Sequence, residues 1–161
     1  MKFLCDDNLG KLAKYLRILG FDTFFKETIS DAELLAVMLK QNRIVLTRDH
    51  NLIKKIEPGK YTLIETDSPD EQLKAVIRSL NLKADENELF SRCLICNEVC
   101  HDVAKEDIAD EVFPYTIKTH EHFKKCPACG RVYWQGSHYK DMVEKLRGVI
   151  GEIDNEMSTL S

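Results

Sequence analysis

The chain has 161 residues, of which 43% are hydrophobic and 31% are charged, as is usual for a soluble globular protein with a buried core. No stretch approaches the roughly 18 apolar residues of a membrane span, and two acids precede any long apolar run. We therefore expect no signal peptide and a cytoplasmic location. The net charge of −4 excludes nucleic-acid binding by overall charge, so any such site must be local.

Strands and helices are predicted to alternate through the first half of the chain. Short apolar runs predict strands at 2–5, 22–26, 43–47 and 61–65. Helical spacing and helix-start signals predict four helices, one over 9–19, one opened by the capping box 30–33, a short one near 50–56 and one over 69–80. Right-handed crossovers would make this half an α/β sandwich with a parallel sheet.

Carboxylates follow the ends of the predicted strands. Asp6 and Asp7 follow the first strand, Asp31 opens the helix after the second, Asp49 follows the third and Asp67 the fourth. Because parallel strands end at the same edge of a sheet, these acids are expected to gather there. A Mg²⁺ or Mn²⁺ ion would take their oxygens as ligands and offset their mutual repulsion. Each acid is also a good helix cap on its own, so metal site and cap both remain open.

Basic residues accompany the acid edge. Lys11, Lys14 and Arg17 recur every three residues on the first predicted helix. Such a stripe is usually only a solvated helix face. Beside the acids it is a candidate contact for phosphate, as is Arg48 at the end of the third strand.

Two Cys-x-x-Cys pairs mark the second half of the chain. Cys93 and Cys96 form the first pair, and Cys126 and Cys129 form the second, which Gly130 follows. Four thiolates are a complete tetrahedral ligand set for structural Zn²⁺, and the glycine permits the tight turn of a zinc knuckle. The alternative is a metal-free pair of reduced thiol turns. Cys100 and His101 are possible substitute ligands. Cys5 lies in an apolar strand and is predicted to be a buried core residue.

The second half also carries a local positive charge. Residues 118–147 contain seven Lys or Arg and three Asp or Glu. Lys124, Lys125 and Arg131 are the predicted RNA contacts of this segment. In the predicted strand 131–134, Tyr133 and Trp134 should face opposite sides, where one would stack on a base or, as we expect, both pack the small sheet. A final helix is predicted around 142–149.

The chain resembles the Mut-seven C-terminal RNase family over residues 2–147. The similarity lies in "FLCDDNLGKLAKYLRILGFDT", "SDAELL", "VLTRD" and "RCLIC…CPACGRVYWQGSHYKDM". It implies a PIN-like domain over 1–82, a linker at 83–91, a zinc ribbon with a C-terminal helix over 92–150 and a frayed tail at 151–161. The matching acids are Asp6, Asp31 and Asp49, with Asp7 or Asp67 as a possible additional acid, and the four cysteines match the zinc ligands.

The resemblance implies a metal-dependent ribonuclease that hydrolyses RNA phosphodiester bonds at a Mg²⁺ or Mn²⁺ site. Two alternatives remain open. One is a non-catalytic adaptor that binds RNA or the ribosome. The other is a receiver-like signalling domain, which also has an acidic pair after its first strand but needs a lysine after a fifth strand.

Overall fold

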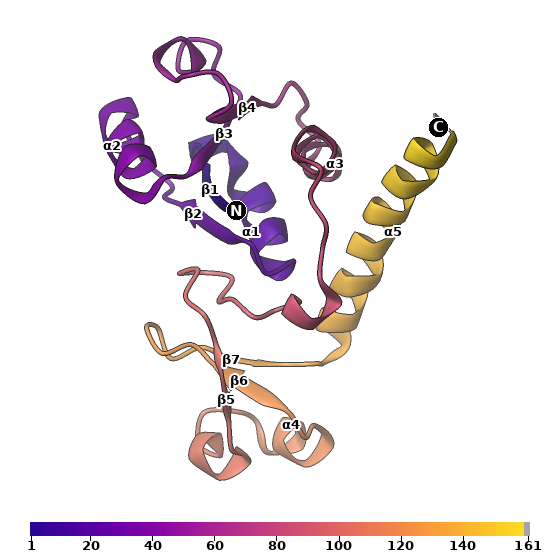
Figure 1. Cartoon of the computed structure of the whole chain (residues 1–161). Helices are drawn as coiled ribbons and strands as arrows, with labels where there is room; N and C mark the ends of the chain where they lie inside the picture. The colour runs from indigo at the N-terminus through magenta and orange to yellow at the C-terminus, as the bar shows by residue number, and fades with distance from the viewer. Residues whose placement is uncertain (160–161) are drawn as a thin grey trace. The chain divides into compact units, whose positions relative to one another are not determined.

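The computed structural model describes residues 1–159 of the chain. It divides into two compact units, Met1–Phe90 and Ser91–Ser161 (Figure 1). Each unit has its own sheet.

A parallel four-stranded sheet forms the centre of the first unit. Its strands are β1 (Lys2–Cys5), β2 (Asp22–Phe25), β3 (Ile44–Thr47) and β4 (Tyr61–Leu63), in the order β2-β1-β3-β4. Most residues of β1 and β3 are buried, as expected for central parallel strands covered on both faces. The predicted α/β class is confirmed, although β2 and β4 end one and two residues earlier than predicted.

Helices flank this sheet on both faces. They are η1 (Asp7–Leu9), α1 (Gly10–Ile18), α2 (Asp31–Gln41), η2 (Ile53–Lys55), α3 (Pro69–Leu80) and η3 (Glu86–Glu88), of which η1, η2 and η3 are short 3₁₀ helices. The crossover β1-α1-β2 runs in one direction along the sheet and β2-α2-β3 runs in the other. Right-handed crossovers therefore place α1 and α2 on opposite faces. Accordingly, α1 packs against α3, while side chains of α2 and of the η2 region share a core cluster.

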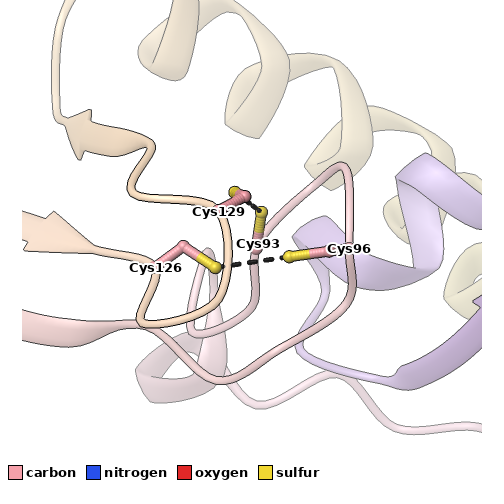
Figure 2. Close-up of side chains that lie close together, drawn as sticks. All are labelled: Cys93, Cys96, Cys126 and Cys129. Carbon is pink, nitrogen blue, oxygen red and sulfur yellow. Dashed lines mark hydrogen bonds between the residues drawn. The ribbon is translucent and has the colours of Figure 1, made fainter.

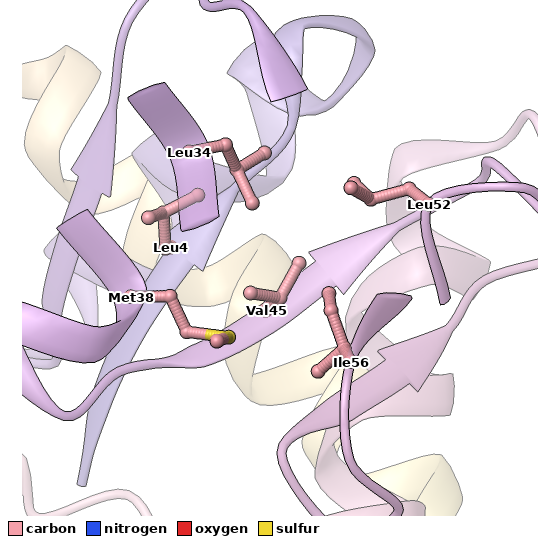
Figure 3. Close-up of a cluster of buried hydrophobic side chains, with 6 residues drawn as sticks. All are labelled: Leu4, Leu34, Met38, Val45, Leu52 and Ile56. Atoms are coloured by element: carbon pink, nitrogen blue, oxygen red, sulfur yellow. The ribbon is translucent and has the colours of Figure 1, made fainter. Parts of the chain in front are cut away.

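The apolar residues of these strands and helices pack together in one core cluster. Figure 3 shows its buried members side by side: Leu4, Leu34, Met38, Val45, Leu52 and Ile56. They come from β1, α2, β3 and the segment around η2. Full burial of each such side chain stabilises the fold by about 1.5–3 kcal/mol.

The second unit contains a small antiparallel sheet of three strands. These are β5 (His101–Val103), β6 (Phe123–Lys125) and β7 (Val132–Trp134), in the order β5-β6-β7. The 3₁₀ helix η4 (Lys105–Ile108) and the helix α4 (Pro114–Thr119) lie between β5 and β6. Ile108, Val112 and Phe123 form the local core there.

The last element is the helix α5 (Ser137–Thr159). Val143, Leu146 and Val149 recur at three-residue steps along it and are buried, so the helix predicted around 142–149 has one apolar face. The helix continues past Gly151, over residues for which a frayed tail was expected. The last two residues of that predicted tail, 160 and 161, lie outside the described residues.

Candidate functional site

A continuous chain of hydrogen bonds links two of the predicted catalytic acids. The Thr47 hydroxyl donates to Asp6 Oδ2 at 2.7 Å, and the same hydroxyl oxygen accepts the backbone N–H of Asp49 at 3.0 Å. Thr47 is fully buried, so its position is fixed by packing. The backbone of Asp6 is also fixed, because its N–H donates to the Leu46 carbonyl at 3.0 Å. Thr47 thus holds both acids at the same edge of the sheet.

Asp6 has the helix-capping role that the sequence left open, whereas Asp49 stabilises only a turn and does not cap η2. Asp6 accepts the N–H of Asp7 at 2.9 Å and caps η1. Asp49 accepts the N–H of Asn51 at 2.6 Å. These bonds occupy only part of each carboxylate, since an ionised carboxylate offers about four acceptor positions. These local bonds and ligand binding are therefore compatible at both residues.

The third acid is placed differently. Asp31 is the first residue of α2, where Ser30 acts as the N-cap and accepts the N–H of Glu33 at 3.3 Å. Asp31 Oδ2 accepts a hydrogen bond from Lys55 Nζ at 2.7 Å. This bond, with a smaller contribution from the charge of Asp49, raises the pKa of Lys55. Lys55 therefore joins the acid edge, although the sequence analysis did not single it out.

The acid edge lies where the strand order reverses. The strand order is β2-β1-β3-β4. The chain leaves β1 toward β2 at one end of the sheet and leaves β3 toward β4 at the opposite end, so the direction changes between β1 and β3. Open α/β sheets bind ligands at such switch points, beyond the carboxyl ends of the two strands. Asp6 follows β1 and Asp49 follows β3, so the chain Asp6–Thr47–Asp49 spans this position.

The other predicted residues of the acid edge take separate positions. Asp7 is exposed in the first turn of η1. Asp67 is exposed and forms an ion pair with Arg48. Lys11 and Lys14 are exposed on α1. Arg17, predicted as an RNA contact, is instead buried, and its Nε donates to the Thr23 carbonyl at 2.9 Å.

The four predicted zinc ligands converge. Their Sγ atoms all lie within 4.8 Å of one another, and Figure 2 shows the four side chains pointing toward a common centre. Cys93 Sγ lies 3.6 Å from Cys129 Sγ, and Cys96 Sγ lies 3.3 Å from Cys126 Sγ. A tetrahedron with Zn–S bonds of about 2.3 Å has sulfur separations of about 3.8 Å. The cluster fits a zinc ion with small adjustments.

Within the described part of the chain, these four cysteines form the one close group of three or more side chains that could hold a metal ion. The three aspartates do not form such a group there. Asp6 and Asp49 are linked through Thr47, whereas Asp31 is held by Lys55.

The two Cys-x-x-Cys turns have the same backbone geometry. In the first, Cys93 N–H donates to the Glu98 carbonyl at 2.8 Å and Asn97 N–H donates to the Cys93 carbonyl at 3.0 Å. The second turn repeats both bonds, from Cys126 to Arg131 at 2.9 Å and from Gly130 to Cys126 at 3.0 Å.

The residue after each pair adopts a left-handed backbone conformation. Asn97 has φ 69° and Gly130 has φ 73°. Glycine and, less often, asparagine tolerate this region. Asn97 is therefore the counterpart of Gly130, which the sequence analysis did not recognise.

The pKa values of the cysteine thiols indicate that the cluster needs a cation to be fully ionised. Burial disfavours the Cys93 thiolate, but hydrogen bonds from the Cys96 N–H and the Tyr133 hydroxyl outweigh it and lower the pKa of Cys93 to about 6. Burial, together with hydrogen bonds to the neighbouring thiols, raises the pKa of Cys96 to about 12. A divalent cation is needed to hold all four sulfurs as thiolates at neutral pH.

The remaining cysteines lie outside the ligand group. Cys100 is buried beside Cys93 and Cys126, and burial and the neighbouring thiolates raise its pKa to about 12. Cys5 is fully buried in β1, and burial raises its pKa. His101 is exposed in β5.

The aromatic and basic residues of the ribbon have distinct surroundings. Tyr133 packs against the cysteine cluster, and the ring of Trp134 lies 6.4 Å from that of Phe123. Three basic side chains were predicted to contact RNA. Lys125 forms an ion pair with Glu111 at 2.6 Å, Lys124 is half-buried and Arg131 is exposed.

Comparison with known proteins identifies the class. The sequence profile of the Mut7-C RNAse domain matches residues 1–146, and the chain belongs to that family. The exonuclease mut-7 homolog of Homo sapiens is 30% identical over 115 residues, which cover 65% of this chain and 13% of that protein. The chain thus spans only a small part of this relative's length. The family match supports a ribonuclease-type function. No solved structure matches the chain.

Within residues 1–159, no helix combines the length and the apolar character needed to cross a membrane.

Proposed function

We propose that the chain is a Mg²⁺- or Mn²⁺-dependent ribonuclease whose active site is the acid edge of a PIN-like unit. Membership of the Mut7-C RNAse domain family supports RNA as the substrate. The observation that carries the position of the site is the hydrogen-bond chain Asp6–Thr47–Asp49 at the switch point of the sheet.

The residues at this edge fit a hard divalent cation. Asp6 is partly exposed and Asp49 is exposed, so solvent reaches both carboxylates. Mg²⁺ is usually held by one or two carboxylates and keeps several waters, which suits a pair of acids better than a closed cage. When bound, such an ion would activate a water molecule and neutralise charge on the phosphate under attack.

The chain's own side chains divide the remaining tasks. Thr47 orients the Asp6 carboxylate, and the free oxygen of Asp49 is the candidate acceptor for a proton of the attacking water. Asp31 holds the Lys55 ammonium, which lies at the same edge and carries the charge needed to contact a phosphate oxygen.

RNA binding is proposed for basic residues around the site and on the ribbon that are exposed or half-buried. Lys11 and Lys14 are the candidates on α1, with Arg48 after β3, and Arg17 is left out because it is buried. Lys124 and Arg131 are the candidates on the second unit. The zinc ion is proposed to be structural, because four cysteines leave no open coordination position.

The decisive experiment compares Asp49→Asn with a matched control. Asp85 makes the same kind of local bond as Asp49, since its Oδ1 accepts the N–H of Asn87 at 2.9 Å. Asn replaces Asp in such turns at little cost. Both variants should fold normally. Only Asp49→Asn should lose Mn²⁺-dependent cleavage of single-stranded and structured RNA. Full activity in Asp49→Asn would refute the proposed site.

The non-catalytic adaptor remains the second candidate. It is favoured by the ion pair of Asp31 with Lys55, which keeps the third acid from joining the other two. Wild-type protein that binds RNA but does not cleave it with either Mg²⁺ or Mn²⁺ would establish this alternative. The receiver-like alternative requires a fifth parallel strand, and the parallel sheet of the described residues has four.

A further inference from the structure

Tyr133 connects the two halves of the cysteine site. It lies in β7, after the second Cys-x-x-Cys turn, and its ring packs against the cysteine cluster. Its hydroxyl oxygen lies 3.1 Å from Cys93 Sγ and 3.1 Å from the backbone nitrogen of Leu94, both in the first turn. Cys93 and Tyr133 are 40 positions apart in the sequence, so this contact joins distant segments.

The direction of these hydrogen bonds follows from chemistry. The Leu94 N–H can only donate, so the Tyr133 oxygen accepts that bond. A zinc-bound cysteine has lost its proton and can only accept. Once zinc is bound, the hydrogen bond between Tyr133 and Cys93 must therefore run from the hydroxyl to the sulfur.

We propose that Tyr133 is a positioning residue of the zinc site, whose hydroxyl donates a hydrogen bond to the Cys93 thiolate and anchors the first turn to β7. The bond has two consequences. It holds Cys93 at the distance the metal requires. It also withdraws electron density from one sulfur, which offsets the negative charge of four thiolates around one divalent ion.

Zinc affinity of the full chain provides the first test. Tyr133→Phe keeps the ring and removes only the hydroxyl. Removing a hydrogen bond to a metal ligand typically weakens metal binding by about 10- to 100-fold, and competition with a chromophoric chelator would measure this loss. Tyr115→Phe is the matched control, because Tyr115 is exposed on α4 in the same unit. It should bind zinc like the wild type.

The absorption spectrum of the cobalt-substituted protein provides a second test. Its charge-transfer band would not change if Tyr133 had only a structural role. A hydrogen bond stabilises the sulfur lone pair and so raises the energy of sulfur-to-cobalt charge transfer. Tyr133→Phe should shift this absorption band to lower energy, while Tyr115→Phe should leave it unchanged. The band arises only from metal-loaded protein, so it remains informative if the metal-free variant unfolds.

Unchanged zinc affinity together with an unshifted cobalt band in Tyr133→Phe would overturn the proposal. Neither readout depends on cleavage of RNA. The result is therefore independent of the proposed ribonuclease activity.

Discussion

Replacing Thr47 with valine tests whether the acid edge is an active site or a set of caps. Valine has nearly the same shape as threonine and suits a buried strand. The substitution removes the hydroxyl that joins Asp6 to Asp49 and leaves both acids in the chain. It therefore changes how the Asp6 carboxylate and the Asp49 backbone are held without changing the charge of either acid.

The expected loss of stability is moderate. A hydrogen bond to a charged group contributes about 1.5–3 kcal/mol. Asp6 is only partly buried, so water replaces part of this bond. The Asp49 N–H also loses its acceptor, which adds to the cost. Together these effects give an expected decrease of about 2 kcal/mol in the free energy of unfolding, near the lower end of that range.

Thr23 offers a matched control on the same sheet. It is also fully buried, and its hydroxyl donates to the Phe21 carbonyl at 3.1 Å, away from the acid edge. Loss of such a neutral bond costs about 1 kcal/mol. Thr23→Val should therefore be slightly less destabilised than Thr47→Val, and its Mn²⁺-dependent RNA cleavage should be unchanged.

The activity assay separates the two interpretations. Loss of a residue that orients a metal ligand reduces metal affinity or activity by about 10- to 100-fold, and this is the expected effect of Thr47→Val at a temperature where both variants are folded. If Thr47→Val cleaves RNA as well as Thr23→Val does, the bond between Thr47 and Asp6 is only a structural contact and the reasoning fails.

Three further predictions follow from the structure. Cys93→Ser, or removal of zinc with a strong chelator, should unfold the second unit and leave the parallel sheet folded, as hydrogen exchange would show, because zinc supplies much of a small ribbon's folding energy; loss of protection in both units would contradict this. Replacing Lys124 and Arg131 by Gln should weaken binding to single-stranded RNA and make the salt dependence shallower by about 1.4 in log–log slope, two contacts at about 0.7 each, and an unchanged slope would exclude both residues from the RNA surface. Arg43→Met should destabilise the chain by about 3 kcal/mol in a denaturant titration, because it removes a buried guanidinium that lies 2.6 Å from the largely buried Asp22 carboxylate and also donates to the Phe3 carbonyl. A negligible change would show that these contacts contribute no net stability.

The strands could be predicted because their sequences match their surroundings closely. Val45 and Leu46 are buried in β3, and the short apolar run around them has few other stable arrangements. The ends were less predictable. Lys26 lies beyond β2, where the pairing with β1 ends at Phe25, and its ammonium pairs with Glu33 at 2.8 Å.

The positions of the site residues could be predicted more readily than their partners. Strand ends in a parallel sheet identify Asp6 and Asp49 from local patterns alone. Thr47 and Lys55 were not found, because their contacts join segments far apart in the chain and depend on strand register. Tyr133 was expected to pack the small sheet, but its hydrogen bond to Cys93 required knowing which face of β7 meets the cysteine cluster.

The separate position of Asp31 has a simple origin in the chain. Asp6 directly follows β1 and Asp49 follows β3 after one residue, so the sheet itself fixes both. Asp31 follows β2 only after residues 26–30, and its position is set by the start of α2. A carboxylate held by a helix start moves with that helix, whereas the other two move with the sheet. Lys55 supplies the nearby positive charge that stabilises Asp31 where it lies. The sheet therefore sets the positions of Asp6 and Asp49 at the switch point, whereas the start of α2 and the ion pair with Lys55 set the position of Asp31.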